Sequence, residues 1–446
     1  MGTGLRIRRA LLVALLILFA AQGSRAEELP PERWTIVHCG SALLVPGQPA
    51  RGETTLVVHE GRIAEVLPGI VEPESIMAGK TGEPEVVDLR EAFVLPGLID
   101  AHVHLTFEHD ADARMRRVSE DEAAAALRGS VYARRTLEAG ITTVRDLGGG
   151  AAVFALRDAI AQGRIPGPRM LVAGHAITPT GGHGDRTNGY REDLFDEPGA
   201  YLGVADGPYE VRKAVRAQVK RGADLIKLTA TGGVLSNTSA GTELQFMDDE
   251  LAEIVSTAHM LGRRVAAHAH GTGGVNAALR AGVDSIEHGT FLDAASVELF
   301  KKSGAWYVPT VIAGVSVGER AKLPGFYPPA VAEKARRVGP QVQDALRRAQ
   351  AGGVRIAFGT DAGVFPHGEN ARELGYMVQA GLLPMDALRA ATVGSATLLG
   401  IESDAGTLEV GKQADLIATR RNALVDVSEL SRVIFVMRGG SVYKRE

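Results

Sequence analysis

The chain has 446 residues, of which 45% are hydrophobic and 23% are charged, so it is long and apolar enough to bury a large core. The formal net charge is only −4 and aromatic residues make up 5%. These values argue against a nucleic-acid-binding protein, because no basic surface is indicated. Many of the 54 glycines follow the end of an apolar run, as expected where strands turn into helices.

The first residues are predicted to be a signal peptide rather than part of the fold. Three arginines at positions 6, 8 and 9 precede an apolar run over residues 10–21, and small residues follow at Ser24 and Ala26. The apolar run is shorter than the roughly 20 residues that span a bilayer, so no stable membrane anchor is expected. We therefore predict a signal peptide over residues 1–26, cleavage after Ala26, and a periplasmic or secreted protein.

Both ends of the remaining chain are rich in short β-type runs. Residues 34–94 contain segments in which apolar and polar residues alternate, broken by glycine and proline, and residues 405–446 repeat that pattern. Because these two ends flank a middle of different character, we predict one small β-sandwich domain assembled from residues 27–95 and 402–446.

The middle of the chain, residues 96–401, alternates apolar strand-like runs with helix-like stretches that carry apolar residues at three- and four-residue spacing. The helix-like stretches include residues 120–140, 207–222 and 248–262. The strand-like runs are residues 96–105, 141–148, 169–178, 223–233, 263–271, 284–289, 306–311 and 354–363. Eight such runs alternating with helices predict an α/β fold, a (β/α)8 TIM barrel built on parallel strands.

Polar side chains interrupt the predicted barrel strands mostly at their C-terminal ends, the face on which barrel enzymes keep their active sites. His102 and His104 end the first strand two residues apart, so both imidazoles face the same side and can bind one ion. His268 ends the fifth strand, His288 the sixth and Asp361 the eighth. Nitrogen and oxygen ligands without a thiolate suit Zn²⁺, with Mn²⁺, Co²⁺ or Fe²⁺ as alternatives.

Lys227 ends the fourth strand inside the apolar run LIKLT. Burial there lowers the pKa of a lysine amine, and a neutral amine can take up CO₂ to become a carbamate that bridges two cations. The alternative is a lysine that reaches the barrel mouth or pairs with Asp361. With N6-carboxylysine at position 227, the site would hold two divalent ions. These ions would lower the pKa of a bridging water from 15.7 toward about 7, which makes hydroxide the nucleophile.

This ordered set of ligands resembles the amidohydrolase superfamily, from LPGLIDAHVHL before the barrel to GTLEVGKQADLIA after it. Within the superfamily the chain is most similar to the imidazolonepropionase-related branch, which includes binuclear zinc Xaa-Pro dipeptidases and Xaa-Arg/Lys carboxypeptidases. The narrower resemblance rests on the motifs ITPTGGHGD, ADLIKLTATGGVLS and RRVAAHAHGTGG. Imidazolonepropionase itself is mononuclear and lacks the bridging lysine, so Lys227 argues against that activity.

The resemblance implies a centre with two divalent metal ions, most simply zinc. One ion is expected on His102, His104 and Asp361, the other on His268 and His288, with carboxylated Lys227 between them. We expect the bridging hydroxide to attack an amide carbonyl. Asp361 then accepts the hydroxide proton and delivers it to the leaving amine.

Substrate contacts are expected from the loops that follow the third and fifth strands. His183 is a candidate to orient the substrate carbonyl or carboxylate, although a loop histidine can also pack against glycines. His270, two residues after His268, is a candidate to polarise the scissile carbonyl. Arg186, Tyr190 and Arg191 are candidates to bind a terminal carboxylate, the arginines by a bidentate contact.

The function that we predict is hydrolysis of the amide bond in dipeptides or N-acyl amino acids, of the Xaa-Pro or Xaa-Arg/Lys dipeptidase and carboxypeptidase type. An alternative is an amidase or lactonase that acts on another amide or ester, such as an N-acyl-phenylalanine toxin. A non-catalytic binding protein is disfavoured, because such descendants typically lose metal ligands and none is missing here. The expected partner is a small-molecule substrate, with no nucleic acid, and we expect a homo-oligomer.

Overall fold

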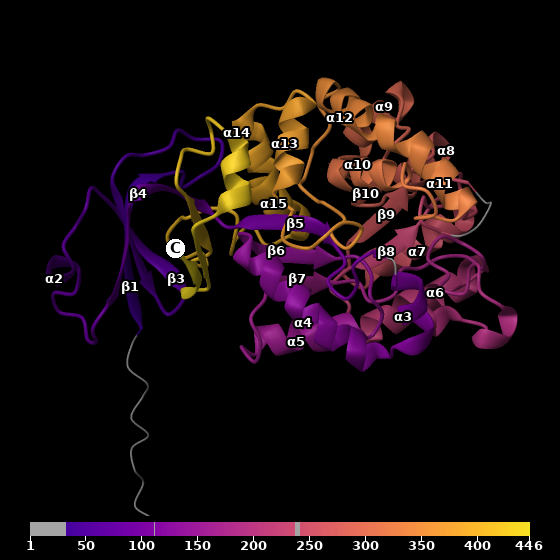
Figure 1. The fold of residues 1–446 in the computed structure, drawn as a ribbon, viewed down its shortest axis with the longest axis horizontal. Coiled ribbons are helices and arrows are strands. Elements are labelled where there is room, and N and C mark those ends of the chain that lie inside the picture. Colours follow the sequence, from indigo (N-terminus) through magenta and orange to yellow (C-terminus); the bar gives the residue numbers. More distant parts are fainter. Residues whose placement is uncertain (1–32, 111, 237–240) are drawn as a thin grey trace, which may run out of the picture.

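A computed structural model describes residues 33–110, 112–236 and 241–446. The predicted signal peptide, residues 1–26, lies outside the described residues. In the part of the chain that is described, no helix has both the length and the apolar character needed to cross a membrane. Figure 1 shows strands from the two chain ends gathered at one end of the molecule, and the helices of the middle segment gathered at the other.

The strands from both chain ends form one sheet of seven strands. Its order is β14-β13-β12-β4-β1-β2-β3, with β1 parallel to β4 and the other neighbours antiparallel. The strands are β1 (Trp34–Ala42), β2 (Thr54–His59), β3 (Arg62–Pro68), β4 (Glu85–Pro96), β12 (Leu416–Thr419), β13 (Phe435–Arg438) and β14 (Ser441–Arg445). The long strand β4 therefore joins the N-terminal strands to the C-terminal ones.

The middle of the chain contributes two parallel sheets. One has the order β5-β6-β7 and the other β11-β10-β9-β8. The strands are β5 (Leu98–Val103), β6 (Ile141–Asp146), β7 (Arg169–Val172), β8 (Ile226–Thr229), β9 (Val265–Ala269), β10 (Ser285–His288) and β11 (Trp306–Val308). These residues are almost all buried, as parallel strands covered on both faces must be. Parallel strands joined through helices confirm the predicted α/β class.

Isolated parallel bridges connect the edges of these two sheets. Ile177, after β7, pairs with Leu228 of β8. Tyr307 of β11 pairs with Ile356, and Val103 of β5 pairs with Ala362. The eighth predicted strand, residues 354–363, is thus present only as bridges and not as a continuous strand. A physical reason lies at Asp361, whose φ of 61° is incompatible with an extended backbone.

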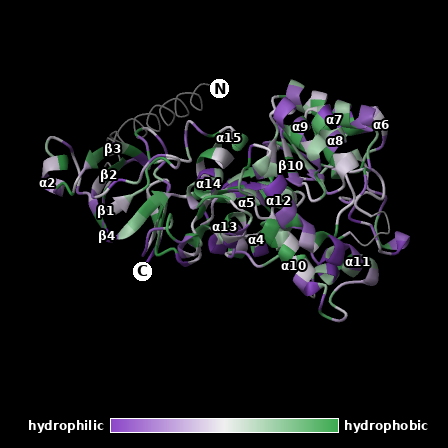
Figure 2. Cartoon of the chain, turned by 90° about the horizontal axis from the view of Figure 1, so that it is seen from above, coloured by the Kyte–Doolittle hydropathy of each residue, from purple (hydrophilic) through white to green (hydrophobic). Residues whose placement is uncertain are grey.

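The short helix α2 (Pro73–Ile76) connects β3 to β4 at the end formed by the chain termini. The other helices accompany the parallel strands: α3 (Ala113–Ser119), α4 (Glu122–Glu138), α5 (Ala152–Ala161), α6 (Gly207–Lys220), α7 (Asp248–Met260), α8 (Thr272–Ala281), α9 (Ala294–Ser303), α10 (Val311–Arg320), α11 (Pro329–Val338), α12 (Val342–Ala351), α13 (Arg372–Gln379), α14 (Pro384–Arg389) and α15 (Ser395–Leu399). Helices α4, α6 and α7 occupy the three predicted helix-like stretches. Figure 2 shows hydrophilic and hydrophobic residues alternating along α7, α8 and α9, as expected of helices with one buried face.

Candidate metal centre and active site

One cavity of about 640 Å³ gathers the polar residues that end the parallel strands. We call it the site cavity. It is lined by all eight residues that the sequence predicts to bind metal or take part in catalysis, namely His102, His104, His183, Lys227, His268, His270, His288 and Asp361. They come from the ends of β5, β8, β9 and β10, from the bridge segment near residue 361, and from the loop after β7. The structure thus brings together residues that lie more than 250 positions apart in the chain.

His102, His104 and Asp361 form one group of potential ligands. An oxygen of the Asp361 carboxylate lies 3.3 Å from Nε2 of His102 and 3.1 Å from Nε2 of His104. Backbone hydrogen bonds fix this geometry, because the Asp361 N–H donates to the His102 carbonyl at 2.7 Å and the His104 N–H donates to the Ala362 carbonyl at 2.8 Å. Burial raises the pKa of Asp361, but His102 and His104 offset that effect and bring the pKa below its usual value.

A buried carboxylate supports His102 from behind. Glu287 lies 3.0 Å from Nδ1 of His102, and its other oxygen accepts from Arg145 at 2.8 Å and from the Ser285 hydroxyl at 2.6 Å. Burial raises the pKa of Glu287, yet Arg145 and His102 outweigh burial and lower it to about 2. The ionised carboxylate favours the His102 tautomer with the proton on Nδ1 and the lone pair on Nε2, which faces the cavity.

His268, His270 and His288 form a second group. One ring nitrogen from each lies within 4.8 Å of the others. A ring nitrogen of His102, one of His288 and a carboxylate oxygen of Asp361 are equally close to one another. Nδ1 of His270 lies 2.8 Å from the Thr290 hydroxyl, so its Nε2 is left for the cavity. Burial lowers the pKa of His270 to about 3 and that of His268 and His288 well below the usual value. Neutral imidazoles are the form that binds metal ions.

Backbone strain is concentrated at this site. Among the described residues, four that are not glycine have a positive φ, and three of them, His288, Thr310 and Asp361, line the site cavity. Each such residue costs on the order of 1–3 kcal/mol and persists only where the surrounding structure imposes it. His288 and Asp361 therefore present their side chains at angles that a regular strand would not provide.

Lys227 lies on β8 and is buried, with 4% of its surface exposed. Burial is the main cause that lowers its pKa to about 8, while Glu287 and Asp361 act in the opposite direction. The alternative of an ion pair with Asp361 is not seen, since no pair within 4.0 Å joins these residues. At neutral pH a tenth or so of such an amine is uncharged, which is the form that reacts with CO₂.

His183 occupies the loop after β7 and packs against the second histidine group. Its ring centroid lies 4.3 Å from that of His268, and a Cβ placed on Gly233 would lie 2.1 Å from the His183 ring. His183 therefore packs against a glycine and also lines the site cavity. Burial lowers the pKa of His183 to about 3, and within the described chain its Nδ1 has no hydrogen-bond partner.

The three predicted carboxylate-binding residues are not all brought to the site. Arg186 and Tyr190 line the site cavity. Arg191 does not, because its side chain is 77% exposed and forms an ion pair with Asp193 two residues later. The structure therefore does not bring Arg191 into the site cavity, and a role for Arg191 in binding a carboxylate stays a prediction.

Several residues at the site were missed by sequence reasoning. Glu287 supports His102 from behind the cavity wall, Thr310 contacts His288 from within the cavity lining, and His175 lines the cavity after β7. Glu287 did carry a signal, since an acid inside the buried run SIEHG needs a partner. Thr310 carried none, because a threonine near a strand end is common.

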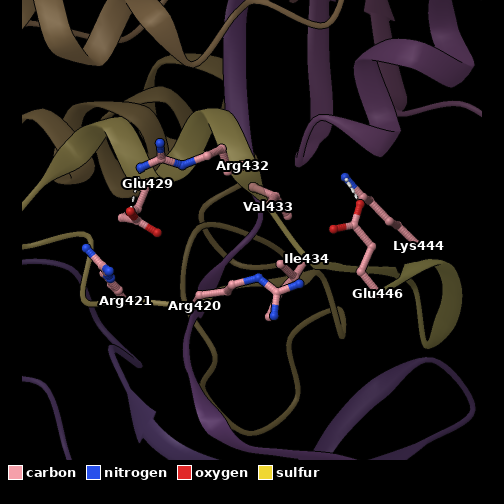
Figure 3. Close-up of a pocket in the computed structure, with 8 residues that line it drawn as sticks. All are labelled: Arg420, Arg421, Glu429, Arg432, Val433, Ile434, Lys444 and Glu446. Atoms are coloured by element: carbon pink, nitrogen blue, oxygen red, sulfur yellow. Dashed lines mark hydrogen bonds and ion pairs between the residues drawn. The ribbon is translucent and has the colours of Figure 1, made fainter.

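A second hollow lies near the C-terminal strands (Figure 3). Its charged side chains pair mainly with one another: Glu429 with Arg432 at 2.6 Å, and Glu446 with Lys444 at 3.1 Å. No histidine is among the described residues that line it. The chemistry that the sequence predicts therefore belongs to the site cavity.

An α/β fold of parallel strands with clustered histidines and a carboxylate at the strand ends defines a metal-dependent hydrolase of the amidohydrolase type. Residues 93–443 match the amidohydrolase family, and the chain belongs to it. It is 34% identical over 435 residues to ochratoxinase from Aspergillus niger, an alignment that spans 92% of this chain and 86% of that protein.

The chain also resembles solved structures of hydrolases. A Xaa-Pro dipeptidase with methionine bound in its active site is 42% identical, with a TM-score of 0.88, and the match covers 92% of this chain and all of that one. A prolidase in complex with N-methylphosphonate-L-proline is 30% identical, with a TM-score of 0.84 and coverage of 93% and 100%. The chain is therefore a hydrolytic enzyme whose relatives act on small molecules.

Proposed function

We propose that this enzyme cleaves the amide bond of dipeptides or N-acyl amino acids before the C-terminal residue. The observation that carries this proposal is the convergence of four strand-end histidines, Asp361 and buried Lys227 in one cavity. The similarity to a Xaa-Pro dipeptidase and a prolidase supports a substrate of the Xaa-Pro or Xaa-Arg/Lys dipeptide class. A volume of about 640 Å³ is within the range of small-molecule sites.

The residues present fit two divalent metal ions, most simply zinc. His102, His268 and His288 are buried, and burial lowers the pKa of each, which favours neutral imidazoles. Asp361 adds a carboxylate to the first group, and Glu287 and Thr310 fix the ring nitrogens of His102 and His288 that face away from the cavity. Histidine and aspartate with no cysteine in the set suit Zn²⁺. His102, His104 and Asp361 would hold one ion, and His268 and His288 the other.

Lys227 is proposed to be carboxylated and to lie between the two ions. Two divalent cations bring four positive charges, which the neutral imidazoles do not offset, and an ammonium at this position would repel them. A carbamate would change the charge of the group from +1 to −1 and would supply oxygen ligands to the metal site. The apolar walls of β8 and the lowered pKa of the amine favour that modification.

Bound ions of this kind supply Lewis acidity and lower the pKa of water from 15.7 toward about 7. The residues of the chain perform the rest of the reaction. Asp361 accepts a proton from the attacking water and delivers it to the leaving amine. When Nδ1 of His270 accepts from the Thr290 hydroxyl, its Nε2 carries the proton and polarises the scissile carbonyl. His183 orients the substrate beside it.

The fold proposal that goes with this function is a closed (β/α)8 barrel over residues 96–401. The bridges at Leu228, Ile356 and Ala362 support it, because they join both open edges of the two parallel sheets. A β-sandwich over residues 27–95 and 402–446 is supported by one shared core, in which Val37 and Leu56 lie in the same cluster as Phe435 and Met437. A sheet bends when its distant strands share a core.

Metal analysis combined with a substrate panel tests this function. The purified enzyme should contain about two divalent ions per chain, lose them and its activity on chelation, and regain both with zinc. The panel comprises Xaa-Pro, Xaa-Arg and Xaa-aromatic dipeptides and matched N-acyl amino acids. A stoichiometry of one ion after zinc loading contradicts the binuclear centre, whereas two ions without turnover of any panel member contradict the substrate class.

A second candidate function is hydrolysis of an N-acyl-phenylalanine toxin or a lactone. The 34% identity to ochratoxinase over most of both chains favours it. A side-by-side measurement of kcat/KM on ochratoxin, Xaa-Phe dipeptides and a simple lactone separates the two. A kcat/KM for ochratoxin above that of every dipeptide would favour the second candidate.

A further inference from the structure

Two arginines of helix α3 face the same cavity as the candidate metal ligands. Arg114 and Arg117 lie three positions apart on α3, so they project from the same side of the helix, and both line the site cavity. Arg114 donates to the Gly189 carbonyl at 3.3 Å, and its guanidinium lies 5.4 Å from the centre of the Tyr190 ring. Arg117 is near enough to Tyr190 to interact with it electrostatically.

These two arginines differ from their neighbours in lacking a carboxylate. Arg116 pairs with Asp110 at 2.7 Å and Arg128 pairs with Glu120. In the described parts of the chain, no carboxylate lies within 4.0 Å of the Arg114 or Arg117 guanidinium. Carboxylates of the protein therefore neutralise Arg116 and Arg128, but not Arg114 and Arg117.

A third guanidinium adds to this positive cluster. Arg186 from the opposite loop interacts electrostatically with Arg117. Its only ion pair in the described chain is a 3.4 Å contact with Glu122, and both side chains are about half exposed, so that pair neutralises little. Crowding by protein atoms is the main cause that lowers the pKa of Arg117, and Arg186 and Arg114 lower it further.

Arg114 and Arg117 are solvent-exposed residues that line the cavity, so their like charges attract an anion that enters from solvent. Arginine suits a carboxylate best, since its planar guanidinium forms two parallel charge-assisted hydrogen bonds. Tyr190 holds Arg114, because its ring lies under the Arg114 guanidinium and its hydroxyl donates to the Arg114 carbonyl at 3.0 Å. Arg114 is thus held in place without being neutralised.

We propose that Arg114 and Arg117 bind a substrate carboxylate remote from the scissile amide, and that this subsite selects anionic substrates. The proposal rests on the proposed function. Two parts of a substrate offer this chemistry: the α-carboxylate of the C-terminal residue, or a carboxylate on the side chain or acyl group of the other half. The role that the sequence suggested for Arg191 then falls to arginines of α3.

The test compares Arg117→Gln and Arg114→Gln with the matched control Arg134→Gln, which removes an exposed arginine of α4 outside the site cavity. Each variant is assayed on four peptides: Ala-Pro and its C-terminal amide, and Glu-Pro and Gln-Pro. Loss of a charge-assisted bidentate contact should lower kcat/KM by roughly tenfold or more for substrates that carry the bound carboxylate, mainly through KM. The control should leave all four values unchanged.

The pattern of losses identifies the source of the carboxylate. A loss for Ala-Pro that is absent for its amide assigns the α-carboxylate, and a loss for Glu-Pro that exceeds that for Gln-Pro assigns the side-chain carboxylate. Equal losses on all four peptides, or no loss, would overturn the subsite. Calorimetric binding of the same peptides to metal-loaded Asp361→Asn enzyme, with and without Arg117→Gln, gives a readout that needs no turnover.

Separate measurements of turnover and of peptide binding distinguish failure of the proposed function from failure of the arginine subsite. If the wild-type enzyme binds two ions but hydrolyses none of the peptides, the proposed function fails, and the binding measurement still decides on the arginines. Peptide affinity that does not change on Arg117→Gln, or the absence of peptide binding to the metal-loaded enzyme, would count against the subsite.

Discussion

Nδ1 of His288 lies 2.7 Å from the hydroxyl oxygen of Thr310, and both residues have a positive φ. His288 ends β10, and Thr310 lies just after β11. The hydrogen bond therefore joins two neighbouring strand ends that are both strained. When His288 donates from Nδ1, its Nε2 lone pair points to the cavity, so Thr310 fixes both the tautomer and the angle of a candidate ligand.

Thr310→Val should weaken metal binding without unfolding the protein. Valine has the same shape and tolerates the strained backbone as poorly as threonine, so the change removes only the hydroxyl. We expect a 10- to 100-fold loss of affinity for the more weakly held ion, the range typical of partners that support metal ligands. Competition with a zinc chelator measures it, and Thr310→Ser should retain wild-type affinity. Equal affinities for the valine and serine variants would contradict the role.

Glu287→Gln should destabilise the fold. Arg145 is buried and would keep its charge without the carboxylate that neutralises it, a change that typically costs about 3–5 kcal/mol. Denaturant unfolding of the metal-free protein gives the free energy. The control is Glu298→Gln, which breaks an exposed pair with Lys301 and should change stability by less than about 0.5 kcal/mol. Similar values for both variants would show that Glu287 is not needed to neutralise Arg145.

Asp361→Asn should abolish most turnover, because an amide of the same size does not accept a proton at neutral pH. We expect kcat to fall by about 10²- to 10⁴-fold. Metal content must be measured on the same sample, since Asp361 also lies among the candidate ligands. If the variant keeps both ions and more than a tenth of the wild-type kcat, the proton-transfer role is incorrect.

Carboxylation of Lys227 should make activation depend on CO₂ and on pH. The pKa of the amine is lowered to about 8, so raising the pH from 6 to 8 increases the fraction of reactive free amine. The rate at which metal-free, CO₂-depleted enzyme recovers activity with zinc and bicarbonate should therefore rise over this range and level off above about pH 9. Lys227→Ala should lose both ions, with partial recovery in short carboxylic acids. Activation that is independent of bicarbonate would argue for an unmodified lysine.

Export predicts a shortened chain in the mature protein. N-terminal sequencing of protein recovered from the periplasm or the medium should begin near Glu27, because the small residues before it form the cleavage site. Recovery of the chain with Met1 intact from the cell interior would contradict this prediction.

The sequence predicts the α/β class and the ligand positions because both depend on local pattern. His102, Lys227 and His268 each end an apolar run, and parallel strands bring such ends to one face. The eighth strand was predicted incorrectly as continuous, since no pattern announces the positive φ of Asp361. The placement of Arg117 in the cavity lining and of Arg191 outside it was equally hidden, because it depends on how α3 and the loop after β7 pack in space.

The position of β4 between β1 and β12 has a consequence for the order of events during folding. Strands β1 to β4 are synthesised first, but one edge of β4 stays unpaired until more than 300 further residues have emerged and β12 can dock. An open edge of this kind is a template for pairing with other chains, and contacts so distant in sequence form slowly. Nascent chains that stall before residue 416 should therefore be the species most prone to aggregate.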